Sequence, residues 1–211
     1  MMKIKWWGHS CFSIEINGIK ILTDPYDDSL PYKKFDDYPD YVTVSHGHFD
    51  HNAVERVNGD FKVVDSEKGL KNDDLNIEAL KSYHDSSKGK NRGENLIYLM
   101  EIGDYRICHL GDLGHLLAEK TINKIKNVDL LLIPVGGNYT IDAETAYKLT
   151  KKIEPKLIIP MHFKTDILDF PITGVEKFTD KFDEEEVNYV NESEINLGET
   201  ENKQVIVLNY S

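Results

Sequence analysis

The chain has 211 residues, of which 40% are hydrophobic, so it can bury a core as one domain over residues 1–211. Its formal net charge of −12 disfavours nucleic acid and anionic membrane surfaces as partners, although a small anionic substrate remains compatible with a metal site. No apolar run is long enough to span a bilayer and no cleaved leader is apparent, which predicts a soluble, cytoplasmic protein without membrane insertion.

The first half of the chain is predicted to consist mainly of short strands. Apolar and β-branched runs predict strands at residues 4–7, 11–16, 19–23, 41–44, 62–64, 77–82, 95–102 and 105–110. Asn17-Gly18 and Gly103-Asp104 are the expected hairpin turns. Residues 27–40, rich in Pro, Asp and Tyr, are expected to be irregular, and residues 53–58 to form a short helix.

In the second half, helices and strands alternate. The sequence predicts helices at residues 116–125, 142–153 and 175–182 and strands at residues 129–133, 157–159 and 204–208. Asp142 caps the second helix, and Pro155 ends it. The acidic run at residues 183–186 is expected to be a solvated helix start without a function. Because strands come first and then alternate with helices, the sequence favours a layered α/β protein with two sheets inside and helices outside.

Two cysteines, Cys11 and Cys108, are too few for a disulfide framework, and their spacing does not indicate metal ligation by thiolates. Both lie in apolar stretches, so we expect each to be a small buried hydrophobic residue.

The strongest chemical signal is His46-Gly47-His48-Phe49-Asp50-His51, directly after a predicted buried strand. Imidazole and carboxylate are the usual ligands of zinc, manganese and iron, and three of the eight histidines gather here, which argues against a chance cluster. Four donors on one loop favour two neighbouring metals over one saturated site. Because one loop cannot complete two coordination shells, His84, Asp112 and His162, each at the end of an apparent strand, are the candidates to do so.

Three motifs resemble, in order, the signature motifs of the metallo-β-lactamase superfamily. They are the His46–His51 cluster, Gly111-Asp112-Leu113-Gly114 and Ile159-Pro160-Met161-His162. Three more are similar to the branch related to L-ascorbate 6-phosphate lactonase and N-acyl-phosphatidylethanolamine phospholipase, namely Gly8-His9-Ser10, Thr23-Asp24-Pro25 and Pro134-Val135-Gly136-Gly137. The resemblance runs from about Lys3 to about Lys164; its first motif is highly specific and the branch motifs moderately so. It implies an αββα sandwich, which agrees with the order of predicted elements.

The resemblance also implies a ligand set, carried over position by position. It places His46, His48 and His84 on the first metal, Asp50, His51 and His162 on the second, and Asp112 between both. All seven positions hold the expected residue type. The motif around His84 is looser, so an ordinary loop histidine stays the alternative there.

Five other residues are weaker candidates for roles in the site. His9 is either a pocket residue or a turn residue bonded to backbone, and Asp24 either fixes the tautomer of a ligand imidazole or forms an Asx-turn. His109 is expected to be structural rather than a ligand. His115 is a candidate for substrate contact or proton transfer, and Lys164 for holding an anionic substrate group.

These features predict a hydrolase with two divalent metal ions, zinc with manganese or iron as alternatives. A metal-bound hydroxide would attack a small-molecule ester, lactone or phosphoester, with Asp112 fixing the metal separation and Asp50 orienting the nucleophile or taking its proton. The alternatives are a phosphodiesterase or nuclease on nucleic acid, which acidity disfavours, and a di-iron redox or sensor protein. The sequence leaves the oligomeric state open.

The walls of the substrate pocket are expected to come from loops around this cluster. The candidates are the irregular residues 27–40, residues 88–94 and the glycine turn at residues 136–140, whose backbone amides could receive an anion.

Overall fold

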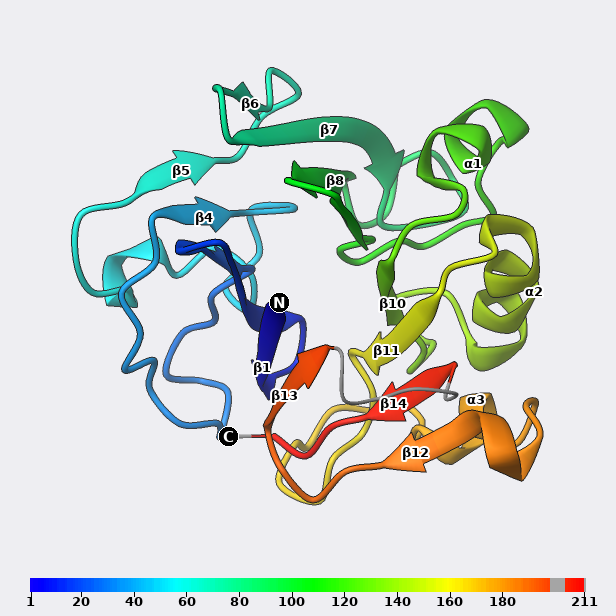
Figure 1. Cartoon of the computed structure of the whole chain (residues 1–211). Coiled ribbons are helices and arrows are strands. Elements are labelled where there is room, and N and C mark those ends of the chain that lie inside the picture. The colour runs from blue at the N-terminus through cyan, green and yellow to red at the C-terminus, as the bar shows by residue number, and fades with distance from the viewer. Residues whose placement is uncertain (198–203, 211) are drawn as a thin grey trace.

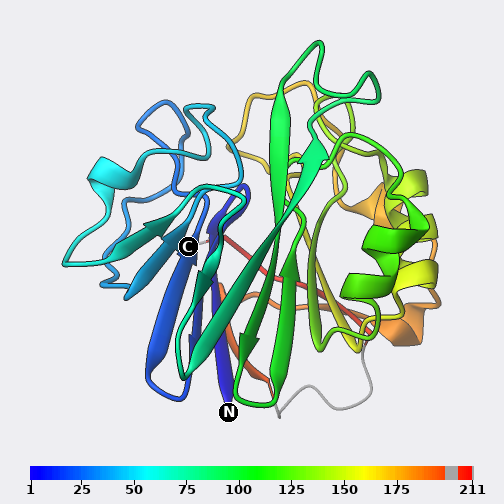
Figure 2. The same ribbon diagram turned by 90° about the horizontal axis from the view of Figure 1, so that it is seen from above.

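The computed structural model describes residues 1–197 and 204–210, which form two β-sheets packed face to face (Figures 1 and 2). Apolar side chains of both sheets meet in one core that includes Ile4, Phe12 and Ile14 of the first sheet and Tyr98 and Ile107 of the second. Within the described residues, no helix has the length and apolar character that crossing a membrane requires.

The first sheet has six strands in the order β13-β1-β2-β3-β4-β5. They are β1 (Met2–Gly8), β2 (Cys11–Ile16), β3 (Ile19–Thr23), β4 (Tyr41–Thr43), β5 (Lys62–Val64) and β13 (Glu194–Leu197). β2 lies between β1 and β3 and pairs antiparallel with both, whereas β3, β4 and β5 pair in parallel. The expected turn at Asn17-Gly18 joins β2 to β3, with both residues at positive φ.

The second sheet has eight strands in the order β12-β14-β11-β10-β9-β8-β7-β6. They are β6 (Leu70–Lys71), β7 (Leu75–Tyr83), β8 (Glu94–Ile102), β9 (Tyr105–His109), β10 (Leu130–Pro134), β11 (Leu157–Met161), β12 (Val187–Tyr189) and β14 (Val205–Val207). The sequence prediction lacked β6, β12 and β13. These short strands lie at sheet edges and carry no fully buried residue, so the apolar pattern that marks a strand is absent from them.

Helices cover the outer face of the second sheet (Figures 1 and 2). They are α1 (Glu119–Ile125), α2 (Ala143–Ile153) and α3 (Glu176–Thr179), with 3₁₀ turns η1 (Val54–Arg56) and η2 (Glu184–Glu186) elsewhere. Asp142 caps α2 as predicted, because its carboxylate accepts the Thr145 amide at 2.8 Å. The predicted helix at residues 53–58 is only η1, and the one at residues 116–125 begins three residues later.

The predicted helix over residues 175–182 is correct only for α3. The buried pair Phe178 and Phe182 has helical spacing, and their rings lie 5.1 Å apart. After Thr179 the chain instead continues through bonds between residues three apart, from the Lys181 amide to the Phe178 carbonyl and from Phe182 to Thr179. The acidic run after it forms η2 with an exposed capping box between Asp183 and Glu186, close to the expected helix start.

Irregular chain covers the outer face of the first sheet (Figure 2). Residues 27–40 are irregular as expected, and Leu30 and Phe35 of this segment, with Tyr26 just before it, pack in a second apolar cluster with Trp7 and Leu22 of the sheet. Cys11 lies in that cluster and Cys108 in the main core, both buried and unpaired, as predicted. The molecule is therefore an αββα sandwich in which one outer layer is largely loop.

The hydroxyl of Tyr98 joins the two sheets next to the metal-ligand loop. It lies 2.7 Å from the carbonyl oxygens of both Val44 and Val64, and its ring is fully buried. We expect Tyr98→Phe to lower the free energy of unfolding by about 1–2 kcal/mol, because the hydrogen bond is lost from a dry environment. Urea unfolding measures this loss. In Tyr105→Phe, where no hydroxyl bond to the described residues is lost, the change should stay below about 0.5 kcal/mol. Equal effects of the two variants would contradict this assignment.

Candidate metal centre

The candidate ligands all follow strands that run in the same direction within their sheet. β1 and β3 are both antiparallel to β2, and β4 is parallel to β3, so these three strands end at one edge of the first sheet. In the second sheet β7, β9 and β11 share a direction through β8 and β10. Each of these strand ends is followed within a few residues by a donor; the donors are His9, Asp24, the His46–His51 loop, His84, Asp112 and His162.

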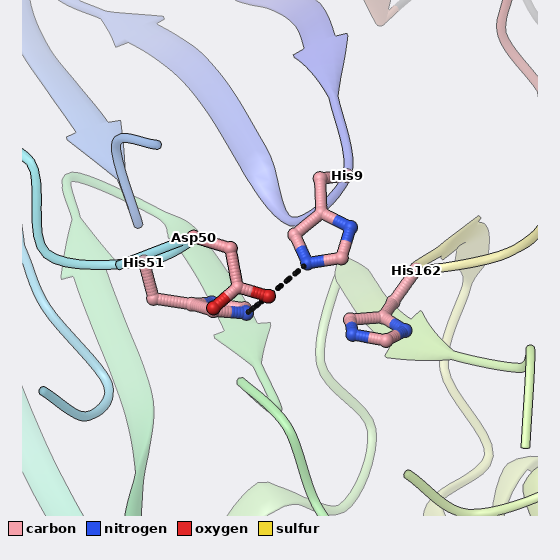
Figure 3. A group of neighbouring side chains, drawn as sticks. All are labelled: His9, Asp50, His51 and His162. Carbon is pink, nitrogen blue, oxygen red and sulfur yellow. Dashed lines mark hydrogen bonds and ion pairs between the residues drawn. The ribbon is translucent and has the colours of Figure 1, made fainter. Parts of the chain in front are cut away.

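The donors gather in three overlapping groups, and within each group the possible ligand atoms lie within 4.8 Å of one another. The groups are His46, His48 and His84; His9, Asp50, His51 and His162; and His46, His51 and Asp112. The structure thus brings together all seven residues expected to bind metal. Figure 3 shows His9 and His162 approaching Asp50 and His51 from the opposite side of the second group.

Asp112 lies where the groups meet. One carboxylate oxygen, Oδ2, is 3.1 Å from Nε2 of both His84 and His162, and the other, Oδ1, is 3.3 Å from Nε2 of His51. Burial acts to raise the pKa of Asp112, but the neighbouring histidines, His162 first, hold it well below its usual value. Asp112 is therefore an anion that contacts one histidine of the first group and two of the second.

The donor set fits a metal because several of its buried atoms have no other partner. His46 Nε2, His51 Nε2 and Asp112 Oδ1 belong to one donor group and make no hydrogen bond within the described residues, although the last two lie 3.3 Å apart as an ion pair. Buried polar atoms are nearly always hydrogen-bonded, so such a convergence needs an explanation. Imidazole nitrogens and carboxylate oxygens without thiolates suit zinc, manganese or iron.

Asp24 and Ser45 orient two of these histidines through their other ring nitrogens. His51 donates its Nδ1–H directly to Asp24 at 2.8 Å. His46 donates its Nδ1–H to the Ser45 hydroxyl at 2.9 Å, and this hydroxyl in turn donates to Asp24 at 2.6 Å. Burial acts to raise the pKa of Asp24, yet the hydrogen bond from His51 lowers it, so this fully buried residue is ionised. Both Nε2 atoms are therefore left facing the donor groups.

The backbone orients His84 in the same way. Its Nδ1–H donates to the carbonyl of Tyr139 at 3.0 Å, which leaves Nε2 beside Asp112. His115, considered above for substrate contact, instead accepts the amide of Tyr83 at 3.2 Å and donates to the carbonyl of Leu116 at 2.8 Å. Both of its ring nitrogens are engaged by backbone, so His115 holds the chain before His84.

His9 lies inside the cluster, where its Nε2–H donates to Asp50 Oδ2 at 3.1 Å (Figure 3). Burial, with His162 beside it, lowers the pKa of His9 to about 4, so the ring is neutral at neutral pH. Burial acts to raise the pKa of Asp50, but His51 and His9 hold it well below its usual value. His9, Asp24 and His162 all have left-handed backbone, with φ of 52°, 40° and 51°. Such strain in non-glycine residues concentrates at functional sites.

Two other candidates from the sequence lie outside the donor groups. His109 donates Nε2–H to the Ser10 carbonyl at 2.9 Å and accepts the Gly111 amide at 3.2 Å, a structural arrangement. Lys164 donates to the carbonyl of Phe170 at 3.1 Å and lies 3.6 Å from the exposed carboxylate of Asp169. Lys164 thus closes the loop that bears Phe170.

Asn95 is a structural element of the site that the sequence did not reveal. From β8, its side-chain oxygen accepts the Asp112 amide at 2.9 Å, and its NH₂ donates to the Leu110 carbonyl at 2.9 Å and to Ser82 at 2.7 Å. Its fully buried amide fixes the start of the Gly111–Gly114 turn. In the sequence it is one polar residue at the start of a strand, without a motif.

A cavity of about 350 Å³ opens over the donor groups. It is lined by His48, Phe49, Asp50, His84, Asn91, Arg92, Asp112, Tyr139, His162 and Phe170. Two of the three expected loop segments contribute, through Asn91 and Arg92 and through Tyr139, whereas residues 27–40 pack on the sheet instead. The amides of Gly136, Gly137 and Tyr139 bond to carbonyls, so these three amides do not form an anion receptor.

Similarity to known sequences agrees with this geometry. The sequence pattern of the β-lactamase superfamily domain matches residues 3–162. A UPF0173 metal-dependent hydrolase of Carboxydothermus hydrogenoformans is 32% identical over 193 residues, which covers 78% of this chain and 85% of that protein. Another, from Staphylothermus marinus, is 33% identical over 199 residues, with 78% and 85% covered.

Solved structures give the same assignment. The crystal structure of a proposed Zn-dependent hydrolase of the metallo-β-lactamase superfamily from Thermotoga maritima matches with a TM-score of 0.82 at 34% identity, over 100% of both chains. The metallo hydrolase Igni18 from Ignicoccus hospitalis shares the fold, with a TM-score of 0.66 at 24% identity over 85% of this chain and 89% of that one. The superfamily and the fold expected from the motifs are confirmed. The chain belongs to the metallo-β-lactamase superfamily, and within it to the family of UPF0173 metal-dependent hydrolases.

Proposed function

We propose that this hydrolase binds two divalent metal ions and cleaves small-molecule esters, lactones or phosphoesters. The observation that carries the proposal is the position of Asp112 between two donor groups, with contacts of 3.1 Å to one histidine of each. One group would hold the first ion through His46, His48 and His84. The second would hold the other ion through Asp50, His51 and His162, with Asp112 shared. Zinc is the favoured metal, with manganese or iron as alternatives.

Divalent ions in such a site supply Lewis acidity and hydroxide at neutral pH. The residues of the chain do the rest. Asp112 fixes the separation of the two donor groups, and Asp50, held by His9 at 3.1 Å, faces the cavity, where it orients the attacking water and accepts its proton. Phe49, Tyr139 and Phe170 supply apolar walls that exclude bulk water around the reacting bond.

A small substrate fits this site better than nucleic acid does. A volume of about 350 Å³ lies at the lower end of the range for small-molecule pockets. Nucleic acid needs several cations along a groove, whereas the net charge is −12 and one Lys or Arg, Arg92, stands among the described lining residues. The two unpaired cysteines, Cys11 and Cys108, fit the cytoplasm, which we propose as its location.

The proposal is tested by activity that depends on the metal. Protein stripped with a chelator and reloaded separately with zinc, manganese or iron is assayed on an aryl ester, a phosphorylated lactone and bis-p-nitrophenyl phosphate. We expect hydrolysis of at least one substrate class, lost on stripping and restored by reloading. A chain that takes up metal but hydrolyses none of the three would contradict the proposed substrate range.

Metal binding is expected to release at least about one proton per chain at pH 7, from His51. Burial acts to lower the pKa of His51, but Asp112, Asp50 and Asp24 raise it well above its usual value, so the metal-free residue is protonated. By contrast, burial and His51 lower the pKa of His46 to about 3. A metal must displace the His51 proton, so apparent affinity falls as the pH drops below that raised pKa. Titration calorimetry in two buffers of different ionisation enthalpy measures the release, and its absence at pH 7 would contradict this assignment.

A further inference from the structure

Arg92 is the one arginine without an acidic partner in the described part of the chain. Arg56 lies 2.6 Å from Asp28 and Arg106 lies 3.5 Å from Glu101, whereas no carboxylate of the described residues lies within 4.0 Å of the Arg92 side-chain nitrogens. Arg92 is half-buried and lines the cavity over the donor groups. A guanidinium partly removed from water and left without an anion lacks the pairing that such groups normally have.

The loop that carries Arg92 is ordered by one buried carboxylate. Asp85 accepts the backbone amides of Ser87, Gly89, Asn91 and Arg92 at 2.7 to 3.0 Å. The loop is closed by a bond of 3.1 Å from the His84 amide to the Gly93 carbonyl. Arg92 precedes Gly93, so its backbone lies one residue from the bond to His84, a metal-ligand candidate. The position of the Arg92 backbone relative to the donor groups is therefore fixed before any ligand binds.

Aromatic side chains complete the surroundings of the guanidinium. It lies over the ring of Tyr139 with 5.2 Å to the ring centroid, and Tyr139 packs edge-on against Phe170 at 5.9 Å. The guanidinium is planar, and its fork of N–H groups matches the two oxygens of a carboxylate or phosphate. Phe49, 54% exposed, adds a further apolar wall to the same cavity.

We propose that Arg92 is a specificity-determining residue that binds an oxyanion, either carboxylate or phosphate, on a substrate with an apolar body. The body lies against Phe49, Tyr139 and Phe170, and the bond to be cleaved lies over the donor groups. This inference rests on the proposed hydrolase function for its kinetic consequence, but anion binding itself is independent of turnover. Arg92 contacts no donor atom, so its removal changes substrate affinity and leaves metal content unaltered.

The first test measures binding on the metal-loaded protein without turnover. Phenylacetate and phenyl phosphate provide the two oxyanions on an apolar body, and phenylacetamide is the neutral reference. Arg92→Gln is expected to weaken binding of at least one oxyanion by about 10- to 100-fold and to leave phenylacetamide unchanged. Lys90→Gln is the matched control, because Lys90 carries the same charge in the same loop but is exposed and outside the cavity lining.

The second test measures the kinetic preference. The p-nitrophenyl half-ester of glutaric acid carries a free carboxylate, and its methyl diester does not. We expect kcat/KM to be higher for the half-ester than for the diester in the wild type and in Lys90→Gln. Arg92→Gln should remove this preference, because it raises KM for the half-ester by about tenfold or more while kcat is retained.

The two tests separate this inference from the proposed function. If neither ester is hydrolysed but anion binding depends on Arg92, the inference stands and the proposed ester hydrolysis fails. If the esters are hydrolysed and Arg92→Gln keeps both the preference and anion affinity, the inference is wrong and the hydrolase remains. Equal losses in Arg92→Gln and Lys90→Gln would mean a general effect of charge and would also overturn it.

Discussion

Asp112→Asn is expected to reduce kcat for hydrolysis by at least about 1,000-fold while the protein stays folded. The fully ionised carboxylate contacts His84, His162 and His51 at 3.1 to 3.3 Å, so it is the residue through which both donor groups would share a ligand. An amide of the same shape carries no charge and turns an N–H₂ group toward the metal positions. Loss of one shared ligand removes several kcal/mol of Lewis-acid stabilisation, which corresponds to a loss of at least three orders of magnitude in rate.

The comparison needs activity, metal content and a far-UV spectrum on the same preparation. Asp104→Asn is the matched control, because this carboxylate lies exposed in the turn between β8 and β9. It should keep wild-type activity. If Asp112→Asn keeps two metals and more than a tenth of the activity, Asp112 is not the shared ligand.

Gly114→Ala is expected to lower the free energy of unfolding by about 3 kcal/mol and Tm by roughly 10 °C. A Cβ at this position would lie 2.3 Å from the His84 carbonyl carbon and 2.4 Å from the Asp85 nitrogen. Backbone on both sides must move, because the Gly114 amide also donates to the Tyr83 carbonyl at 2.9 Å. Displacement of His84 by about 1 Å would additionally lower activity by about 100-fold.

Another glycine of the site provides the control for this effect. A Cβ on Gly47, between two ligand candidates, meets no atom within 4 Å, so Gly47→Ala should change Tm by less than about 2 °C. Differential scanning calorimetry compares the two variants. Equal stability of Gly114→Ala and Gly47→Ala would show that the close approach to His84 can relax without cost.

Local sequence patterns were enough to predict those site residues that stand in short motifs. The His46–His51 loop and the strand-end positions of His84, Asp112 and His162 come together as expected, because parallel strands deliver their carboxyl ends to one edge. The order of strands and helices predicted only a layered α/β protein, the resemblance of the motifs implied the αββα class, and the matched structures confirm that class. Only the contents of one outer layer differ, where aromatic loop residues replace helices.

The roles of the other residues around the site could not be predicted, because they depend on contacts between segments that are distant in the sequence. Asn95 reaches Asp112 from 17 positions away, and His9 reaches Asp50 across 41, distances at which no local pattern applies. His115 and Lys164 had suitable chemistry, but backbone partners engage both, which periodicity cannot indicate. Arg92 had no motif at all. Its exposure to the cavity follows from Asp85 ordering its loop, a set of bonds that only the folded chain makes.

Metal stoichiometry distinguishes a site that holds two ions with Asp112 between them from a site that holds one. Protein purified without chelator and reloaded with zinc is analysed for metal per chain by elemental analysis, in the wild type and in His48→Ala. We expect two equivalents in the wild type and fewer in the variant, because His48 belongs to one donor group alone. A fully active wild-type protein with a single equivalent per chain would contradict the dinuclear site.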